Sequence, residues 1–143
     1  MILIDASILL HSYDSSSPRH EAARRWLEET LSQPEPVALS WQGILAFLRI
    51  TTNSRAMDHP CSLDESLTIV SSWLERPTVI ILAPGERHFE ILRKLISEGQ
   101  AFGRLAADAD LAALAIEHGA TLSTSDREFS RFPGLRTLNP FTT

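Results

Sequence analysis

Hydrophobic and polar positions along the chain form two patterns, short apolar runs and longer segments with helical spacing. The clearest apolar run is TVIIL at Thr78–Leu82, which is β-branched and continuous and is followed by a Pro-Gly turn. It predicts a strand buried on both faces, and MILI at Met1–Ile4 predicts another. Three shorter runs predict further strands, at Val37–Ser40, Ala120–Thr124 and Leu135–Leu138.

The segments between these runs have the signals of helices. In SSSP, Ser17 is a predicted N-cap with Pro18 at the first helical position, and this helix should end near Leu31. A capping box at Ser62–Glu65 begins another helix. Further helices are expected at residues 7–13, 41–53, 86–98 and 108–118. Within residues 41–53, apolar side chains recur at helical spacing, at Trp41, Ile44, Leu45 and Leu48.

Strands that alternate with helices predict an α/β fold. Such a chain forms a parallel sheet with helices on both faces, because each connection between parallel strands is long enough to hold a helix. We therefore expect a three-layer α/β/α domain with a central, mainly parallel sheet of four to five short strands. The 143 residues suit one domain, residues 1–143.

Composition and charge narrow the classes of function. The net charge of −5 argues against a protein that binds nucleic acid over a broad basic surface. The thirteen cations are twelve arginines and one lysine, Lys94. A GC-rich genome explains this bias more simply than selection for phosphate contacts does. The arginines nevertheless form local patches that could hold a polyanion beside an acidic site: Arg19, Arg24 and Arg25; Arg49 and Arg55; Arg127, Arg131 and Arg136.

The sequence argues against a membrane span, a signal peptide, an internal disulfide and a zinc site. No stretch approaches the roughly 20 apolar residues of a membrane span, and no basic region precedes the first apolar run. The single cysteine, Cys61, has no partner for an internal disulfide, and no Cys/His cluster has the spacing of a zinc site. We therefore expect a cytoplasmic protein without a membrane segment.

Three acidic residues should meet at one edge of the predicted sheet. Asp5 directly follows the first strand, and Asp126 follows the strand at Ala120–Thr124. Ligands bind at the carboxyl ends of strands in open α/β sheets, so both acids should lie at that edge. Asp108 begins a helix that leads away from the same edge, and the strand before Asp126 returns to it.

Converging carboxylates need a counter-charge. Two unit charges 4 Å apart repel by about 4 kcal/mol at an effective dielectric near 20. Oxygen ligands without His or Cys favour Mg²⁺, with Mn²⁺ as a substitute. Each acid alone has a simpler structural explanation, because Asp108 and Asp126 could cap helices and Asp5 could form an Asx-turn. Their shared edge favours a metal site, with Asp110 and Glu128 exposed or supporting it.

These acidic segments resemble a known family. LIDASIL, DADLAALA and STSDREF are similar to the three acidic motifs of PIN-domain nucleases, above all the VapC toxins of toxin–antitoxin pairs. WQGILAFLRITTNSR and RFPGLRTLNP also resemble one VapC branch. The resemblance implies a PIN-like fold and an Mg²⁺-dependent endoribonuclease that acts on structured RNA such as tRNA through a metal-activated water. It also implies a cognate VapB-type antitoxin and a homodimer.

The motifs also imply residue roles. Asp5, Asp108 and Asp126 match the catalytic, metal-binding acids of the family. Ser7, Thr124 and Arg49 match its supporting polar and basic residues.

One position departs from the family pattern. The family usually carries Glu on the third helix, three residues before the Arg, and here that position is Ala46. Asp110 or Glu128 could substitute for this acid. The alternative is a non-catalytic module of the same fold that binds RNA or an antitoxin without cutting. A phosphatase of the haloacid dehalogenase type fits less well, because Ser7 stands where it would need a second Asp.

Overall fold

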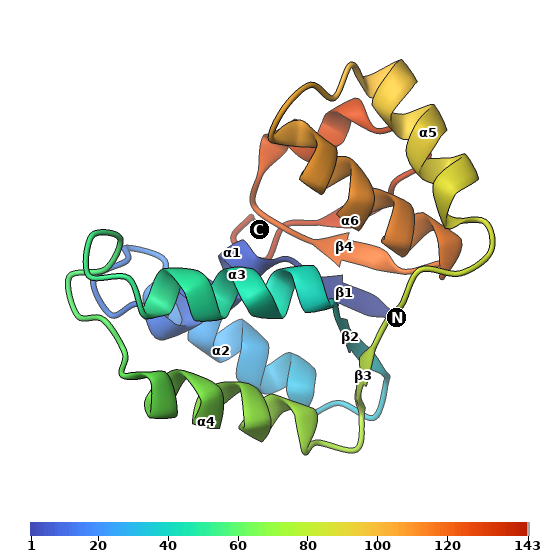
Figure 1. The fold of residues 1–143 in the computed structure, drawn as a ribbon. Coiled ribbons are helices and arrows are strands. Elements are labelled where there is room, and N and C mark those ends of the chain that lie inside the picture. Colours follow the sequence, from blue (N-terminus) through green and yellow to red (C-terminus); the bar gives the residue numbers. More distant parts are fainter. Residues whose placement is uncertain (143) are drawn as a thin grey trace.

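A central parallel sheet with helices on both faces organises the computed structural model, which describes residues 1–142 (Figure 1). The strands are β1 (Ile2–Ile4), β2 (Val37–Leu39), β3 (Val79–Ile81), β4 (Thr121–Ser123) and β5 (Thr137–Leu138). The helices are α1 (Ala6–Tyr13), α2 (His20–Leu31), α3 (Trp41–Thr51), α4 (Leu63–Leu74), α5 (His88–Gly99), α6 (Leu105–Glu117) and the 3₁₀ helix η1 (Arg127–Arg131). All four strand pairs are parallel, which confirms the predicted three-layer fold.

The strand order reverses beside β1. The order is β3-β2-β1-β4-β5, so the chain first builds outward from β1 to β3 and then returns to the other side of β1 with β4 and β5. Ile4 of β1 pairs with Ser123 of β4, and the Asp5 N–H donates to the Ser123 carbonyl at 3.0 Å. Ligands bind at such a reversal because the connections on its two sides leave the sheet in opposite directions. The segments after β1 and β4 therefore meet at a natural ligand site.

Successive residues of the strands face two separate cores. Leu3, Ala38 and Leu122 are fully buried in the core that includes α5 and α6. Their strand neighbours, such as Ile4 and Leu39, pack into the other core, with helices α1 to α4. This alternation follows from the two-residue period of a strand. It accounts for the separation of α5 and α6 from α1 to α4 on opposite sides of the sheet (Figure 1).

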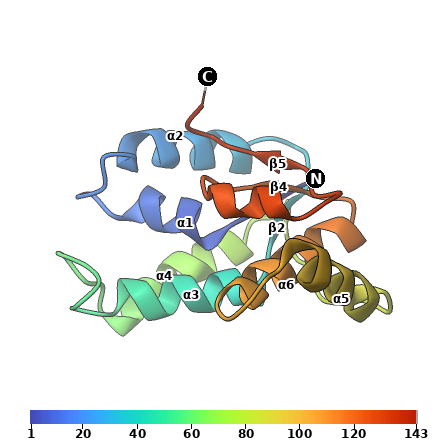
Figure 2. The ribbon, with the colours of Figure 1, turned by 90° about the horizontal axis from the view of Figure 1, so that it is seen from above.

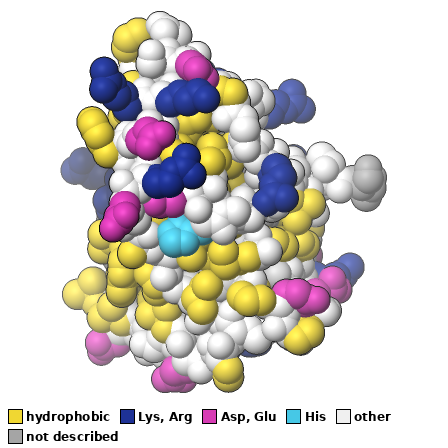
Figure 3. All heavy atoms as spheres, turned by 90° about the vertical axis from the view of Figure 1, so that its right-hand side faces the viewer, with side chains coloured by type: hydrophobic (Ala, Val, Ile, Leu, Met, Phe, Trp, Pro, Cys, Tyr) yellow, Lys and Arg dark blue, Asp and Glu magenta, His cyan; other side chains and the backbone are white. Residues whose placement is uncertain are grey.

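The segment predicted to be the clearest buried strand is an edge strand. β3 pairs only with β2, and Ile80 is 40% exposed, whereas Val79 and Ile81 pack against the core. The prediction of burial on both faces was wrong because an apolar run does not specify whether a helix covers each face of the strand. Figure 3 shows the side of the molecule on which β3 and α5 lie, the right-hand side of Figure 1. Hydrophobic side chains gather over its lower part, and Lys and Arg over its upper part, where α5 lies.

The buried face of α3 also differs from the prediction. The Ser40 side chain caps the helix by accepting from the Gly43 N–H at 2.9 Å. Gly43, Ile44, Phe47 and Thr51 face the core, while Trp41 and Leu45 are 56% and 61% exposed. Helical spacing fits both faces, and the large Phe47 ring decides between them by packing against Trp73, with 4.8 Å between ring centroids.

The start of α2 and the segment after β5 are the remaining features of the fold. α2 begins at His20, two residues later than predicted, because Ser17 instead forms a turn in which its Oγ accepts from the Arg19 N–H at 3.1 Å. After β5 the chain lies alongside α2 (Figure 2), and the Arg19 guanidinium is 4.7 Å from the Phe141 ring centroid. Within residues 1–142, no helix is long and apolar enough to cross a membrane.

Candidate functional site

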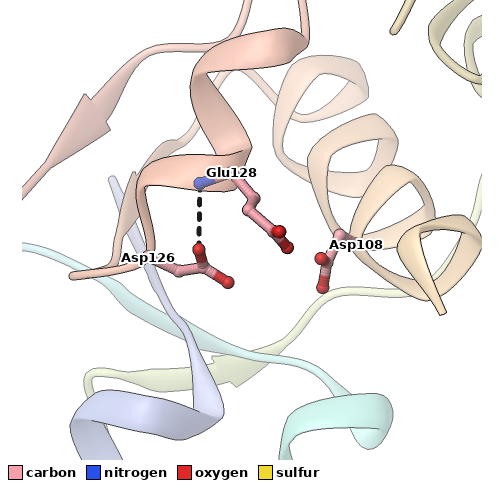
Figure 4. Close-up of side chains that lie close together, drawn as sticks. All are labelled: Asp108, Asp126 and Glu128. Atoms are coloured by element: carbon pink, nitrogen blue, oxygen red, sulfur yellow. Dashed lines mark hydrogen bonds between the residues drawn. The ribbon is translucent and has the colours of Figure 1, made fainter. Parts of the chain in front are cut away.

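Three carboxylates from different elements converge at the carboxyl edge of the sheet. Asp108 comes from α6, Asp126 from the segment after β4, and Glu128 from η1. One carboxylate oxygen of each residue lies within 4.8 Å of those of the other two. Figure 4 shows Asp108 and Glu128 pointing toward each other with Asp126 beside them. We refer to these three residues as the acidic cluster.

Asp5 lies beside the acidic cluster and is tied to it through Thr124. Asp5 Oδ2 accepts from Thr124 Oγ1 at 2.8 Å and from Ser7 Oγ at 2.9 Å. The Asp126 N–H in turn donates to Thr124 Oγ1 at 3.1 Å. Thr124 is buried, so its hydroxyl is held in place between the two acids. Ser7 and Thr124 thus orient Asp5 without neutralising its charge.

Burial, and after it the proximity of these acids, raises the pKa values of Asp5 and Asp108. Burial raises the pKa of Asp5 above its usual 3.8, and the charge of Asp126 adds to this effect against the hydrogen bonds from Thr124 and Ser7. Burial and then the charges of Asp126, Asp5 and Glu128 raise the pKa of Asp108 to about 6. Both directions mean that the ionised forms of Asp5 and Asp108 are disfavoured, first by loss of solvent and then by neighbouring negative charge.

Arg104 offsets part of this charge at Glu128. Its guanidinium donates to both Glu128 carboxylate oxygens, at 2.8 and 3.0 Å. This contact lowers the pKa of Glu128. Arg104 was not predicted as a site residue, because nothing in a lone arginine before Asp108 in the sequence indicates a partner 24 residues away. The signal that could have found it is the predicted convergence of the segments containing Asp108 and Asp126.

The capping explanation for Asp108 is wrong, whereas that for Asp126 is right. α6 begins at Leu105, with Arg104 as N-cap residue, so Asp108 lies in the first helical turn. Residues such as Leu105 and Ala106 have high helix propensity and extend the helix beyond the predicted start. Asp126 caps η1 by accepting from the Glu128 N–H at 2.9 Å. Asp126 therefore has a structural role in addition to its place in the acidic cluster.

The two candidates for a substitute acid, Asp110 and Glu128, lie in different places. Asp110 Oδ1 is 2.7 Å from Nε2 of the buried His88, and its Oδ2 accepts from Gln42 Nε2 at 3.1 Å. Asp110 thereby joins α6 to α5 and α3, outside the acidic cluster. Residues two apart on a helix point in different directions, which explains why Asp108 and Asp110 separate. Glu128 instead adds a further carboxylate to the acidic cluster.

The two α3 residues singled out from the sequence make no polar contact with the acidic cluster. Ala46 provides no carboxylate, and Arg49 is exposed in the last turn of α3. Across residues 1–142, the Arg49 side chain has no hydrogen bond or ion pair. Arg49 is therefore free to contact a ligand that approaches from solvent.

The acidic cluster and Asp5 fit a hard divalent cation. Carboxylate oxygens are the ligands that Mg²⁺ and Mn²⁺ prefer, and they come here from separate rigid elements. The raised pKa values of Asp5 and Asp108 show that a positive charge would stabilise the ionised forms. Asp5, Asp108, Asp126 and Glu128 are the residues that could hold such an ion.

A pair of substitutions distinguishes Glu128 from Asp110. Glu128→Gln should lower the affinity for Mn²⁺ about tenfold, because the oxygen that remains carries no charge. Asp110→Asn should leave this affinity within a factor of about two. Isothermal titration calorimetry at neutral pH measures both constants. A larger loss for Asp110→Asn than for Glu128→Gln would contradict this assignment.

Comparisons with known proteins agree with this architecture. The family model of the PIN domain matches residues 2–135. The chain is 34% identical over 140 residues to "Ribonuclease VapC37" of Mycobacterium tuberculosis, covering 98% of this chain and 97% of the relative. Its fold is similar to that of VapBC2 from Rickettsia felis bound to a promoter DNA fragment, with a TM-score of 0.70, 19% identity and coverage of 97% and 98%. It is also similar to VapC20 of M. tuberculosis, a sarcin-ricin loop cleaving toxin, with a TM-score of 0.66, 18% identity and coverage of 95% and 99%.

Proposed function

The chain belongs to the PIN-domain family and, within it, to the VapC ribonucleases, and on this premise we propose that it is a metal-dependent endoribonuclease and the toxin of a toxin–antitoxin pair. Residues 1–143 form one PIN domain in this proposal. The observation that carries it is the convergence of Asp108, Asp126 and Glu128 beside Asp5, at the point where the strand order reverses.

The chain's own residues have distinct tasks in this reaction. Asp5, Asp108 and Asp126 would hold Mg²⁺, or Mn²⁺ in its place, and Glu128 would supply the carboxylate that Ala46 lacks. When bound, a divalent metal would supply Lewis-acid chemistry, activating a water and stabilising negative charge on the phosphodiester oxygens. Thr124 and Ser7 fix the orientation of Asp5. Arg49 contacts a phosphate of the substrate from the exposed end of α3.

The proposed substrate and partners are based on the similarity of this chain to VapC proteins. We propose a structured RNA as the substrate, with tRNA as one candidate and, by likeness to VapC20, a sarcin-ricin loop as another. A VapB-type antitoxin would bind the protein, as in the similar VapBC complexes. A homodimer is the proposed assembly.

The second candidate function is a module that binds RNA or an antitoxin without cutting. Two observations favour it: Ala46 has no carboxylate, and Arg104 neutralises part of the charge of Glu128. If Glu128 stayed paired with Arg104 on metal binding, three acids would remain for the ion. Discrete RNA products are the readout that separates the two functions.

The deciding experiment is incubation of purified, antitoxin-free protein with total cellular RNA. With Mg²⁺ or Mn²⁺ we expect discrete fragments whose ends define one target, and with EDTA we expect none. If the folded protein binds RNA but yields no fragments with either metal, the binding module replaces the nuclease. Ala46→Glu is then the variant to test for restored cleavage.

A further inference from the structure

A pocket of about 350 Å³ adjoins the acidic cluster on the side of η1 and β5. It lies between the segment after β4, the 3₁₀ helix η1 and the end of β5. Its lining includes Asp126, Arg127, Phe129, Ser130, Thr137 and Asn139. Asp126 belongs to both the pocket and the acidic cluster. The pocket and the acidic cluster are therefore adjacent.

The pocket is constructed from rigid elements. β4 and β5 pair in parallel, and the Thr124 N–H donates to the Leu138 carbonyl at 2.9 Å. Phe129 is 2% exposed and gives the pocket an apolar floor. Ser130 Oγ donates to the Arg127 carbonyl at 2.8 Å and fixes the turn of η1. Such a rigid, partly apolar hollow with a few polar groups is typical of a ligand site.

Its polar groups are available to a ligand. Asn139 Oδ1 accepts from the Phe141 N–H at 3.0 Å, which holds the side-chain amide in place. Within residues 1–142, the two N–H donors of this amide have no partner. The Arg127 guanidinium likewise makes no hydrogen bond or ion pair there, whereas the neighbouring Arg131 and Arg136 are bound to backbone carbonyls at 2.9 and 2.7 Å. The pocket thus offers amide donors and a guanidinium group to a ligand.

We infer that this pocket binds the base of the nucleotide next to the cleaved phosphate, an inference that rests on the proposed ribonuclease function. Proteins read single-stranded RNA by hydrogen bonds to the edges of unstacked bases and by packing on their faces. The Asn139 amide would donate to an edge of the base that occupies the pocket. Arg127 would bind a phosphate of the same strand through its planar guanidinium. The pocket thereby sets the base preference at one position beside the cut.

The test compares two serine-to-tryptophan variants. Ser130→Trp places a large ring at the pocket, whereas Ser71→Trp makes the same change at an exposed position of α4. We expect Ser130→Trp to raise KM about tenfold, since the loss of the base's hydrogen bond to Asn139 costs about this much. Sequencing of fragment ends should show the wild-type base preference in Ser71→Trp and its loss in Ser130→Trp. Mn²⁺ affinity should be equal in both variants.

A second variant examines Asn139 directly. Asn139→Asp keeps an acceptor for the Phe141 N–H but removes both side-chain donors. The preferred base beside the cut should change in this variant. An unchanged preference in both Asn139→Asp and Ser130→Trp, with cleavage intact, would overturn the inference and leave the proposed nuclease standing.

A binding measurement separates the pocket from the catalytic function. The probes are AMP, GMP, CMP and UMP, each added to ¹⁵N-labelled protein with Mg²⁺ present. At least one nucleotide should shift the amide resonances of Arg127, Ser130 and Asn139 in the wild type and in Ser71→Trp, but not in Ser130→Trp. If these shifts occur in a protein that cuts no RNA, the pocket stands and the nuclease proposal falls. Shifts confined to other residues would refute the pocket.

Discussion

Replacing Asp5 with asparagine is expected to reduce RNA cleavage by about a thousandfold or more. The side-chain oxygen of the new asparagine can still accept from Ser7 and Thr124, so the local geometry is kept. The negative charge that would hold a divalent cation is lost. A thousandfold decrease corresponds to about 4 kcal/mol of lost transition-state stabilisation, which is a reasonable cost for one charged ligand of a catalytic ion. Single-turnover cleavage of a mapped RNA target measures the effect.

The same substitution should not destabilise the fold. Burial raises the pKa of Asp5, so its ionised form is less favourable in the folded protein than in the unfolded chain at neutral pH. A neutral asparagine removes this cost, and the free energy of unfolding should stay equal or rise. Asp58→Asn, at an exposed loop position, controls for the loss of one negative charge. Full cleavage by a folded Asp5→Asn protein would remove Asp5 from the active site.

The sequence predicted the layers and the edge at which the acids lie because both depend on topology. Strand and helix alternation requires parallel strands, and parallel strands bring the residues that follow them to one edge. Asp5 and Asp126 follow β1 and β4, and the structure places them on the two sides of the strand reversal. Their spacing in the chain was sufficient for this inference. Their roles in metal binding and catalysis stay predictions.

Details that depend on tertiary packing could not be read from the sequence. TVIIL predicted a strand buried on both faces, but the packing of helices on the sheet decides burial, and Ile80 of β3 is 40% exposed. Helical spacing in α3 fitted two faces, and Phe47 selected the one that exposes Trp41 and Leu45. Contacts between a side chain and a segment far away in the sequence could not be predicted either.

The separation of Glu128 from Asp110 shows the same limit at the site. Both lie two residues after a motif aspartate, at Asp126 and Asp108. In α6 a two-residue step turns the side chain away, and Asp110 meets His88. After Asp126 the chain forms the short η1 instead, and Glu128 stays in the acidic cluster. The difference arises from the local backbone geometry of the two segments.

Addition of Mg²⁺ is expected to stabilise the folded protein strongly at neutral pH. A ligand that binds only the folded state at 100 times its Kd adds about 2.7 kcal/mol to the free energy of unfolding. For a chain of this length, such a gain corresponds to a rise in Tm of roughly 8 °C. The physical source is the relief of repulsion among Asp108, Asp126, Glu128 and Asp5. Thermal unfolding followed by circular dichroism, with Mg²⁺ or EDTA, measures it.

The pH dependence of this stabilisation identifies the groups that cause it. Asp108 has a pKa of about 6 in the folded protein, above its usual 3.8, so the folded state binds more protons between these values. Without metal, the contribution of Asp108 to stability is fully present below about pH 4 and is lost as the pH rises through 6. The difference in Tm between the wild type and Asp108→Asn isolates this contribution from that of other acids.

Because protons compete with the metal for Asp108 at low pH, Mg²⁺ should stabilise the wild type more at about pH 7.5 than at about pH 5. Asp110→Asn should retain the whole effect, because His88 and Gln42 hold Asp110 outside the acidic cluster. An equal Tm with Mg²⁺ and with EDTA at the higher pH would show that these acids hold no such ion.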